Sequence, residues 1–427
     1  MNAKQLLIFA FAFCLSGQTK AENINDWLAK QLRASLELRY VDYDQMWAEA
    51  MDNRDNVGGM LFALTIVDYC DAYALDSLML SLIDTLLVRG TDSELKDGNA
   101  AYLLDKKYRR MILQNRYDEI ERMACYVDRR WGEDSTMMRR ADQWHRMAEA
   151  GKNIPPVSIR REKNVVRLAP DNLHGHMCIN ADVNRQRNAC FMVDTGELSS
   201  TVLSRWLANQ AGIHLLPDST LVSTADNPDS IGSMQHGVVD SLRIDGITFY
   251  NLPVKVSDLV VGQDFDGIIG APDLIRLEYM ELSYDSIVFR YPPPAHEEGA
   301  NFVMNAGVRG DRSISLPYVI DGYNGTFILD TGANCLMFPP QFTNREEGFF
   351  VGIGGTENWM EGKFEPHDYV PFSDSRSFLG RPILKSFERL CFNFRDAHVD
   401  YVRKPDVRQI EYRGLLLIHK LERKPFR

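Results

Sequence analysis

The sequence predicts a multi-domain protein with an N-terminal all-α domain followed by a mainly-β region of two lobes. Residues 22–152 carry apolar side chains at helical spacing, whereas residues 155–427 carry short alternating segments bounded by Gly, Asn, Asp and Pro. The β-rich part also contains two near-copies of one motif, which indicates an internal duplication. We expect one lobe over residues 155–296 and the other over residues 300–427.

The helical prediction depends on runs in which apolar residues recur three and four positions apart, namely Met60–Val67, Ala74–Val88 and Tyr117–Val127. This spacing is typical of amphipathic helices. Pro155 and Pro156 then form a break that a helix does not cross easily. Such a domain could stabilise the rest of the chain, act as a prosegment or bind a protein partner, but the favoured interpretation is a packed helical module with no independent function.

Composition excludes some classes of partner. The chain has 427 residues with a net charge of −11, which argues against nucleic acid or an anionic membrane as a ligand. Because no apolar stretch reaches about 18 residues, we expect no membrane-spanning helix. A Pro-rich stretch, 292–300, separates the two copies of the motif and reads as a linker between the lobes.

Each copy of the duplicated motif contains an aspartate directly after an apolar segment. Three apolar residues run directly into Asp194-Thr195-Gly196, and three more run into Asp330-Thr331-Gly332. Two carboxylates held together cannot both ionise cheaply, so they share a proton and supply a general acid and a general base. Gly allows the tight turn, and the Thr hydroxyl can hydrogen-bond to the opposite loop.

A second signal follows each motif in the same order. Ile268-Ile269-Gly270 follows the first, and Phe378-Leu379-Gly380 follows the second. Each signal is followed by a further strand, Met280–Tyr291 and Leu390–Val402. With these four motifs, residues 158–404 resemble the aspartic peptidases, whose lobes each carry an Asp-Thr-Gly loop and a later apolar-apolar-Gly strand packed against it.

The resemblance implies a bilobal acid-protease fold with two β-barrel-like lobes and no metal or other cofactor. The chain resembles the retropepsin-like branch more than the pepsin-like one, because no aromatic flap residue can be placed. It implies catalytic roles for Asp194 and Asp330, with both lobes on one chain facing each other; a homodimer that pairs Asp194 with its own copy is the alternative. The supporting residues it implies are Thr195, Gly196, Glu197, Thr331, Gly332 and Ala333, with Ile268, Ile269, Gly270, Phe378, Leu379 and Gly380 as the strands packed against the loops.

The predicted function is hydrolysis of peptide bonds in a peptide or protein substrate by a water that the Asp pair activates. No His-Glu-x-x-His motif is present, and His174-Gly-His176 is an isolated pair. The alternatives are a catalytically inactive secreted scaffold that binds a peptide or protein, with the helical domain recruiting a partner, and a β-rich duplication with chance Asp-Thr-Gly turns.

Two features modify the predicted site. Glu197 stands where the family usually has Ser or Ala, and a third carboxylate near the pair would shift activity toward less acidic pH unless its side chain faces solvent. The polar stretch Ser223–His236 is the expected flap over the substrate. The second lobe has room only for a reduced counterpart at Gly352–Thr356.

The N-terminus resembles a secretory signal. Lys4 precedes the apolar run Leu6–Leu15, and we expect cleavage after Ala21. The mature protein would then be periplasmic, on the cell surface or extracellular, as for a bacterial-type secreted aspartyl protease. Lipidation of Cys14 is the less favoured alternative, because the large Phe13 precedes it.

Export makes disulfides permissible, and the cysteines of the expected mature chain fall two by two into the three domains. We expect Cys178 and Cys190 to flank a hairpin centred near Asn184 and to form a bridge. The alternative is a set of six buried free thiols.

Overall fold

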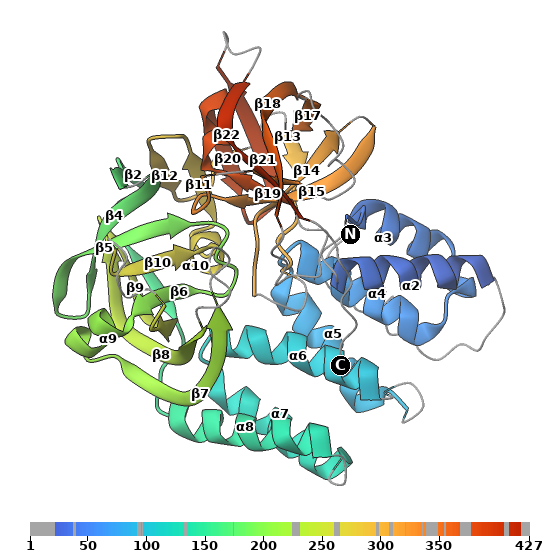
Figure 1. Ribbon diagram of the computed structural model, residues 1–427. Coiled ribbons are helices and arrows are strands. Elements are labelled where there is room, and N and C mark those ends of the chain that lie inside the picture. Colours follow the sequence, from blue (N-terminus) through green and yellow to red (C-terminus); the bar gives the residue numbers. More distant parts are fainter. Residues whose placement is uncertain are drawn as a thin grey trace.

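The computed structural model describes residues 22–36, 40–91, 95, 97–131, 135–173, 175–223, 231–259, 265–295, 299–306, 311–320, 322–334, 336–338, 349–353, 356–367, 377–404 and 410–419. The N-terminal helices and the β-rich bilobal region that follows them are both present (Figure 1), so the predicted fold class is confirmed. The expected signal peptide, 1–21, lies outside the described residues.

The helical domain packs its helices around one apolar core. In α7, the buried residues recur at helical spacing, acidic residues lie in the first turn and arginines lie in the last, which suits the helix dipole. Among the described residues, no helix combines the length and apolar character needed to cross a membrane. The helices are α2 Glu22–Leu36, α3 Tyr43–Asp52, α4 Gly59–Ala72, α5 Asp76–Arg89, α6 Asp97–Leu113, α7 Tyr117–Trp131 and α8 Ser135–Gly151, with the 3-10 turn η1 Arg54–Asn56.

The first lobe is a strongly curved sheet in the order β1-β9-β6-β10-β5-β4-β8-β7, with β3 beside β4. Because β9 also pairs with β8, the sheet curls back on itself. Two short helices, α9 Arg205–Ala211 and α10 Ala271–Ile275, follow β6 and β10. The strands are β1 Ser158–Arg161, β3 Asp171–Leu173, β4 His176–Val183, β5 Gln186–Asp194, β6 Thr201–Ser204, β7 His214–Ser223, β8 Ile231–Ile244, β9 Ile247–Ser257 and β10 Gly267–Gly270.

The second lobe is a closed barrel in the order β14-β15-β19-β16-β22-β18-β17. The 3-10 helix η3 Arg381–Ser386 follows β19, at the position that α10 has after β10. The strands are β14 Ser315–Ile320, β15 Tyr323–Asp330, β16 Leu336–Phe338, β17 Phe349–Ile353, β18 Thr356–His367, β19 Ser377–Gly380 and β22 Ile410–His419.

A third sheet joins the two lobes. Its order is β13-β21-β20-β11-β12-β2, so strands from both halves of the chain share one ladder. At the junction, Met280 of β11 pairs with Phe392 of β20. The strands that follow each Gly signal therefore bind the lobes together within one chain. They are β2 Val165–Leu168, β11 Tyr279–Leu282, β12 Ile287–Arg290, β13 Gly299–Asn301, β20 Phe387–Asn393 and β21 His398–Arg403.

The helical domain packs against both lobes (Figure 1). Leu216 of β7 and Val238 of β8 belong to the apolar core of the helices. From the second lobe, the buried Arg312 donates to the carbonyl oxygen of Asp71 at 2.6 Å and pairs with the carboxylate of Asp76. From the first lobe, Arg276 donates to the carbonyl oxygen of Leu113. Apolar burial and buried ion pairs thus connect the three parts of the chain.

The predicted disulfide is not formed: Cys178 and Cys190 are both free thiols, although their side chains lie close enough to hydrogen-bond to each other. The expected hairpin of β4 and β5 is present, but its register pairs Cys178 with Met192 and Asn180 with Cys190. The two cysteines are therefore diagonal neighbours, and a register shift near Ala181 contributes to this offset. Cys70, Cys125 and Cys391 are also free.

Candidate active site

Each lobe brings its aspartate to the end of a buried strand in the same way. Asp194 ends β5, which pairs in parallel with β10, and Asp194 lies opposite Gly270. Asp330 ends β15, which pairs in parallel with β19, and Asp330 lies opposite Gly380. The predicted strands Ile268–Gly270 and Phe378–Gly380 therefore pack beside the two Asp-Thr-Gly loops. Apolar side chains drive these strands inward, so the turn that follows is fixed by the core.

The backbone of the two loops repeats the same hydrogen bonds. The N–H of Glu197 donates to the carbonyl oxygen of Asp194 at 3.3 Å, and the N–H of Ala333 donates to that of Asp330 at 3.2 Å. The carbonyl oxygens of Glu197 and Ala333 then each accept a 2.9 Å bond, from Ala271 and Arg381 respectively. Glu197 and Ala333 are therefore structural equivalents that differ only in their side chains.

The two threonines connect the loops across the lobe boundary, as expected from the sequence. Both are fully buried. The Thr195 hydroxyl donates to the carbonyl oxygen of Leu329 at 2.6 Å, and the Thr331 hydroxyl donates to that of Val193 at 2.7 Å. Each hydroxyl also accepts a bond from the backbone N–H of the other threonine, at 3.0 and 3.1 Å. This closed set of bonds fixes the position of one aspartate relative to the other.

The two glycines leave room for the carboxyl groups of the opposite lobe. A Cβ at Gly196 would lie 2.4 Å from Cγ of Asp330, and a Cβ at Gly332 would lie 2.5 Å from Cγ of Asp194. These separations are far below van der Waals contact, so only glycine fits here. Asp194 and Asp330 come from positions 136 residues apart and meet at this point.

The environment of the two carboxyl groups raises the pKa of both. Burial is the largest cause, and the two groups also hydrogen-bond to each other. The pKa of Asp330 is raised well above its ordinary value, because the charge of Asp194 adds to the cost of burial. Asp194 receives backbone N–H bonds from Gly196 at 2.8 Å and Gly332 at 3.2 Å, and these favour its charged form. The two carboxyl groups therefore titrate as a pair that shares a proton.

Glu197 is partly buried and its carboxylate turns toward Ser199, accepting bonds from the Ser199 hydroxyl and, at 2.8 Å, from its N–H. The side chain thus does not simply face solvent. Burial raises the pKa of Glu197, Lys255 lowers it, and the nearby Asp194 carboxylate raises it slightly further. Glu197 is therefore electrostatically connected to the pair without being part of it.

The expected flap corresponds to the hairpin of β7 and β8, whose strands pair from His214–Val238 to Ser223–Ile231. Its tip, 224–230, lies outside the described residues. In the second lobe, β17 and β18 pair up to Ile353 and Thr356, where the reduced counterpart was expected, with 354–355 between them outside the described residues. A gating role for either hairpin stays a prediction.

Two residues near this site received no role from the sequence. Asp273 is buried, and its carboxylate accepts a 2.7 Å bond from the N–H of Thr201 and a 3.0 Å bond from Arg276. Lys255 influences the pKa of Glu197, Asp218 and His236, so a cation lies among these groups. Asp273 has a local signal, because it lies three residues after Gly270, where the second lobe has Ile383 after Gly380. Lys255 has none.

Comparison with known proteins finds one matching family, within the first lobe. Residues 179–272 match the family model described as aspartyl protease. The matched residues include Asp194 and Gly270, whereas Asp330 lies beyond the match and is placed by the repeated geometry described above.

Solved structures that are similar to this chain include a retropepsin-like aspartic protease from Rickettsia conorii, with 24% identity over 30% of this chain and 100% of that chain at a TM-score of 0.25. Another is basic 7S globulin from soybean, with 10% identity over 58% of this chain and 97% of that chain at a TM-score of 0.37. A comparison with curated protein sequences found no match.

Proposed function

We propose that the chain is an endopeptidase that hydrolyses peptide bonds with a water activated by Asp194 and Asp330. The observation that carries this proposal is the contact of two carboxyl groups across the lobe boundary, each packed against the glycine of the opposite loop. Burial of two carboxyl groups is costly, and a binding scaffold has no need of it. The shared sheet of β11 and β20 supports a site built within a single chain.

The surroundings of the pair support different roles for its members. Asp194 accepts two backbone N–H bonds and is the charged member, so it acts as the general base. Asp330 accepts a 2.9 Å bond from the N–H of Ala333, has the more strongly raised pKa and acts as the general acid. In this proposal, the environment and not the motif assigns the roles, because the two motifs are the same.

The proposed reaction has two proton-balanced steps. In the first, Asp194 takes a proton from water while the water oxygen bonds to the carbonyl carbon, and Asp330 gives its proton to the carbonyl oxygen. In the second, the C–N bond breaks, the leaving nitrogen receives the proton held by Asp194, and a hydroxyl of the intermediate returns a proton to Asp330. The pair is then restored, and no other proton donor is needed.

The test is cleavage of a diverse peptide library by the purified chain, assayed across pH. We expect the wild-type chain to cleave, and Asp194→Asn and Asp330→Asn to lose at least about 1,000-fold, since each removes a group that acts in the transition state. Asp240→Asn is the matched control, because Asp240 is an exposed carboxylate of β8. Cleavage that survives in all variants would point to a contaminant, and no cleavage by any would favour the inactive scaffold.

We also propose that the chain is exported. The support is the N-terminal pattern of Lys4, the apolar run Leu6–Leu15 and Ala21. N-terminal sequencing of protein isolated from the producing cell tests this. A mature chain that begins at Glu22 supports export by signal cleavage, and a modified Cys14 at the new terminus would indicate lipidation instead.

A further inference from the structure

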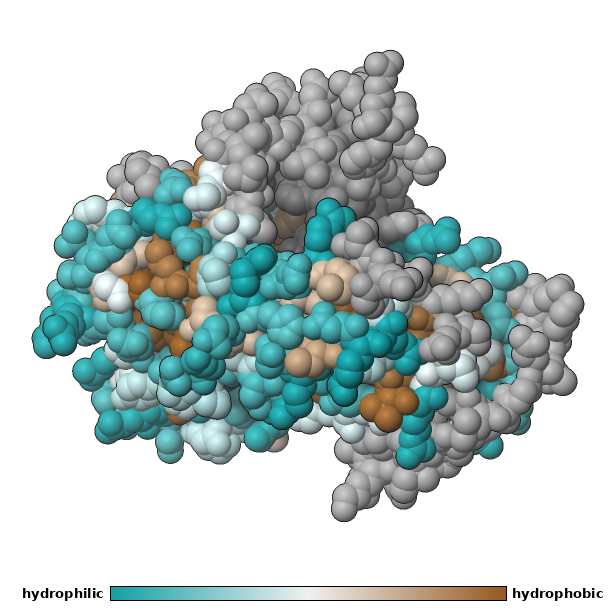
Figure 2. Space-filling model, turned by 90° about the horizontal axis from the view of Figure 1, so that it is seen from below, coloured by the Kyte–Doolittle hydropathy of each residue, from teal (hydrophilic) through white to brown (hydrophobic). Residues whose placement is uncertain are grey.

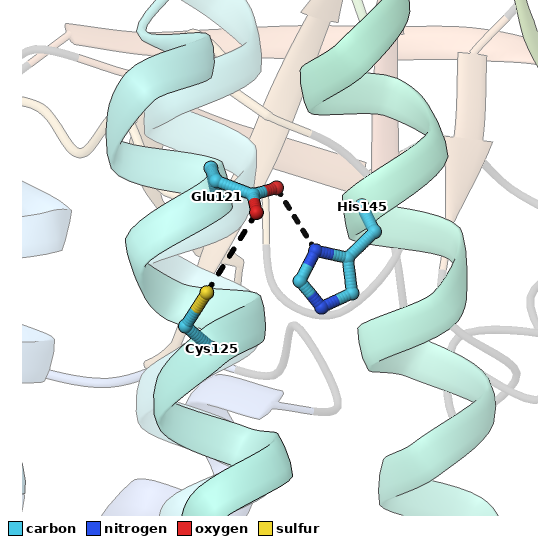
Figure 3. Close-up of side chains that lie close together, drawn as sticks. All are labelled: Glu121, Cys125 and His145. Carbon is cyan, nitrogen blue, oxygen red and sulfur yellow. Dashed lines mark hydrogen bonds and ion pairs between the residues drawn. The ribbon is translucent and has the colours of Figure 1, made fainter.

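A group of metal-ligating side chains lies on the helical domain, away from the two aspartates. Glu121 and Cys125 are four residues apart on α7, so they lie on one face of that helix one turn apart. His145 projects toward them from α8, as Figure 3 shows. One ligand atom from each of the three lies within 4.8 Å of the others. Three different ligand types from two helices thus converge on one point.

The histidine ring is oriented by a second carboxylate. Its Nδ1 lies 2.9 Å from Oε2 of Glu121, and its Nε2 lies 2.8 Å from Oδ2 of Asp128. Asp128 lies on α7, one turn after Cys125. A ligating histidine usually donates its other N–H to a carboxylate, which fixes the tautomer and turns the free nitrogen toward the metal. Asp128 is placed for this role. Its contact with His145 is independent of the convergence of the three ligands.

The separations suit a small tetrahedral ion. Zn²⁺ binds nitrogen and oxygen at about 2.0–2.1 Å and thiolate sulfur at about 2.3 Å, so neighbouring ligands in a tetrahedron lie roughly 3.3–3.6 Å apart. Here Nδ1 of His145 lies 2.9 Å from Oε2 of Glu121, Sγ of Cys125 lies 3.7 Å from the other carboxylate oxygen, Oε1, and the three ligand atoms lie within 4.8 Å of one another. Small side-chain rotations therefore admit the ion, which takes the place of the proton between His145 and Glu121.

The ligand chemistry selects the metal. A thiolate, an imidazole and a carboxylate together favour Zn²⁺ over Mg²⁺ or Ca²⁺, which prefer oxygen ligands. The ion also balances the two negative charges of the thiolate and the carboxylate. The surface of the molecule seen from below in Figure 2, where α7 and α8 lie, is mainly hydrophilic, and His145 is 32% exposed. Zinc can therefore reach the group from solvent.

We propose that Glu121, Cys125 and His145 bind one Zn²⁺ per chain, with Asp128 orienting the histidine and water in the fourth position. The ion would link α7 to α8. Because Gln143 of α8 donates to Asp218 of β7 at 2.8 Å, this link stabilises the part of the helical domain on which the β7–β8 hairpin rests. The site is independent of peptide hydrolysis.

The test measures zinc bound per chain and the thermal unfolding temperature, under a reductant that does not chelate metals. We expect the wild-type chain to retain one Zn²⁺ after dialysis and to unfold at a higher temperature with it. Cys125→Ser and His145→Ala should lose both effects, and Asp128→Asn should weaken binding about 10–100-fold. Cys190→Ser is the matched control, because Cys190 is a partly exposed free thiol of the first lobe.

Co²⁺ gives a second readout, since a thiolate ligand produces an intense near-ultraviolet absorption that Cys125→Ser should abolish. Circular dichroism of each metal-free variant checks that it folds. Absence of zinc from the wild-type chain, or equal zinc in the wild-type chain and Cys125→Ser, would overturn the proposal. If Cys190→Ser loses the zinc and Cys125→Ser keeps it, the zinc is bound in the first lobe, and this result would also overturn the proposal.

Discussion

Thr195 and Thr331 hold each other across the boundary between the lobes. Each backbone N–H donates to the hydroxyl of the other residue, at 3.0 and 3.1 Å, although the two residues are 136 positions apart. Each hydroxyl in turn donates to a carbonyl oxygen of the opposite strand. All of these groups are buried, so the relative position of Asp194 and Asp330 depends on bonds that water does not replace.

Replacement of Thr331 by Ala should therefore weaken both the lobe contact and catalysis. It leaves the N–H of Thr195 and the carbonyl oxygen of Val193 without their partner. We expect the free energy of unfolding to fall by about 2–4 kcal/mol, since each buried group left unpaired costs about 1–3 kcal/mol. Thr331→Ser keeps the hydroxyl and should recover most of this loss in urea unfolding. Equal loss in both variants would assign the effect to the methyl group.

A methyl group at position 332 should disable the site with little effect elsewhere. Gly332→Ala places a Cβ 2.5 Å from Cγ of Asp194 and must displace that carboxyl group. We expect kcat to fall by roughly 100-fold or more, because displacement of a catalytic group by about 1 Å can cost that much. Gly98→Ala on α6 is the control, since its Cβ meets nothing within 4 Å. Full activity in Gly332→Ala would contradict a catalytic role for Asp194.

The free energy of unfolding of Asp330→Asn, relative to that of wild type, should increase as pH rises. The pKa of Asp330 is raised in the folded state by burial and by Asp194, so the folded chain binds this proton more tightly than the unfolded chain. The wild type therefore loses free energy of unfolding as pH increases above about 4, the ordinary carboxyl pKa, up to the raised pKa. Asn does not titrate. Thermal unfolding of both proteins at several pH values should show a difference that grows with pH, and a constant difference would contradict the raised pKa.

Glu197 should adjust the acid limb of the pH–rate profile without being required for turnover. Its pKa is raised in part by Asp194, and the interaction is reciprocal, so charged Glu197 raises the pKa of Asp194. Glu197→Gln should move the acid limb to lower pH while kcat at the optimum stays close to that of wild type. Glu162→Gln, at a surface ion pair with Arg243, is the control. An unchanged pH–rate profile would mean that the charge of Glu197 does not influence the pKa of Asp194.

Arg312 should be essential to the attachment of the helical domain. Its guanidinium is buried against Asp71 and Asp76, and Arg312→Met leaves these carboxylates partly uncompensated. We expect a loss of about 3–5 kcal/mol in the free energy of unfolding, whereas Arg243→Met at an exposed pair should cost less than about 1 kcal/mol.

The buried contact of Arg312 with Asp71 and Asp76 also allows a test of whether the helical domain is a prosegment. Proteolytic cleavage within 151–156 should leave the two pieces associated in gel filtration of the wild-type chain. Separation of the pieces would favour a helical domain that is removed in maturation.

Local patterns were sufficient where one face of an element is buried. The periodicity of Tyr117–Val127 predicted α7, because its apolar side chains need a common core. The Asp-Thr-Gly loops and their Gly strands were also readable, since each motif contains the strand that positions it. The hairpin that carries Cys178 and Cys190 was readable as well, but its register was not, because register depends on the turn and its bulge.

The sequence by itself determined the two carboxylates, the duplicated strand order and the change from helical to β texture, because these depend on short-range periodicity and turn chemistry. Only the tertiary structure brought the carboxyl groups of Asp194 and Asp330 together and surrounded them with different N–H groups, although they lie in the same motif. It also brought His145 to Glu121 and Cys125. Hydrogen bonds and electrostatic interactions act over a few ångströms in space, and chain position does not fix those distances.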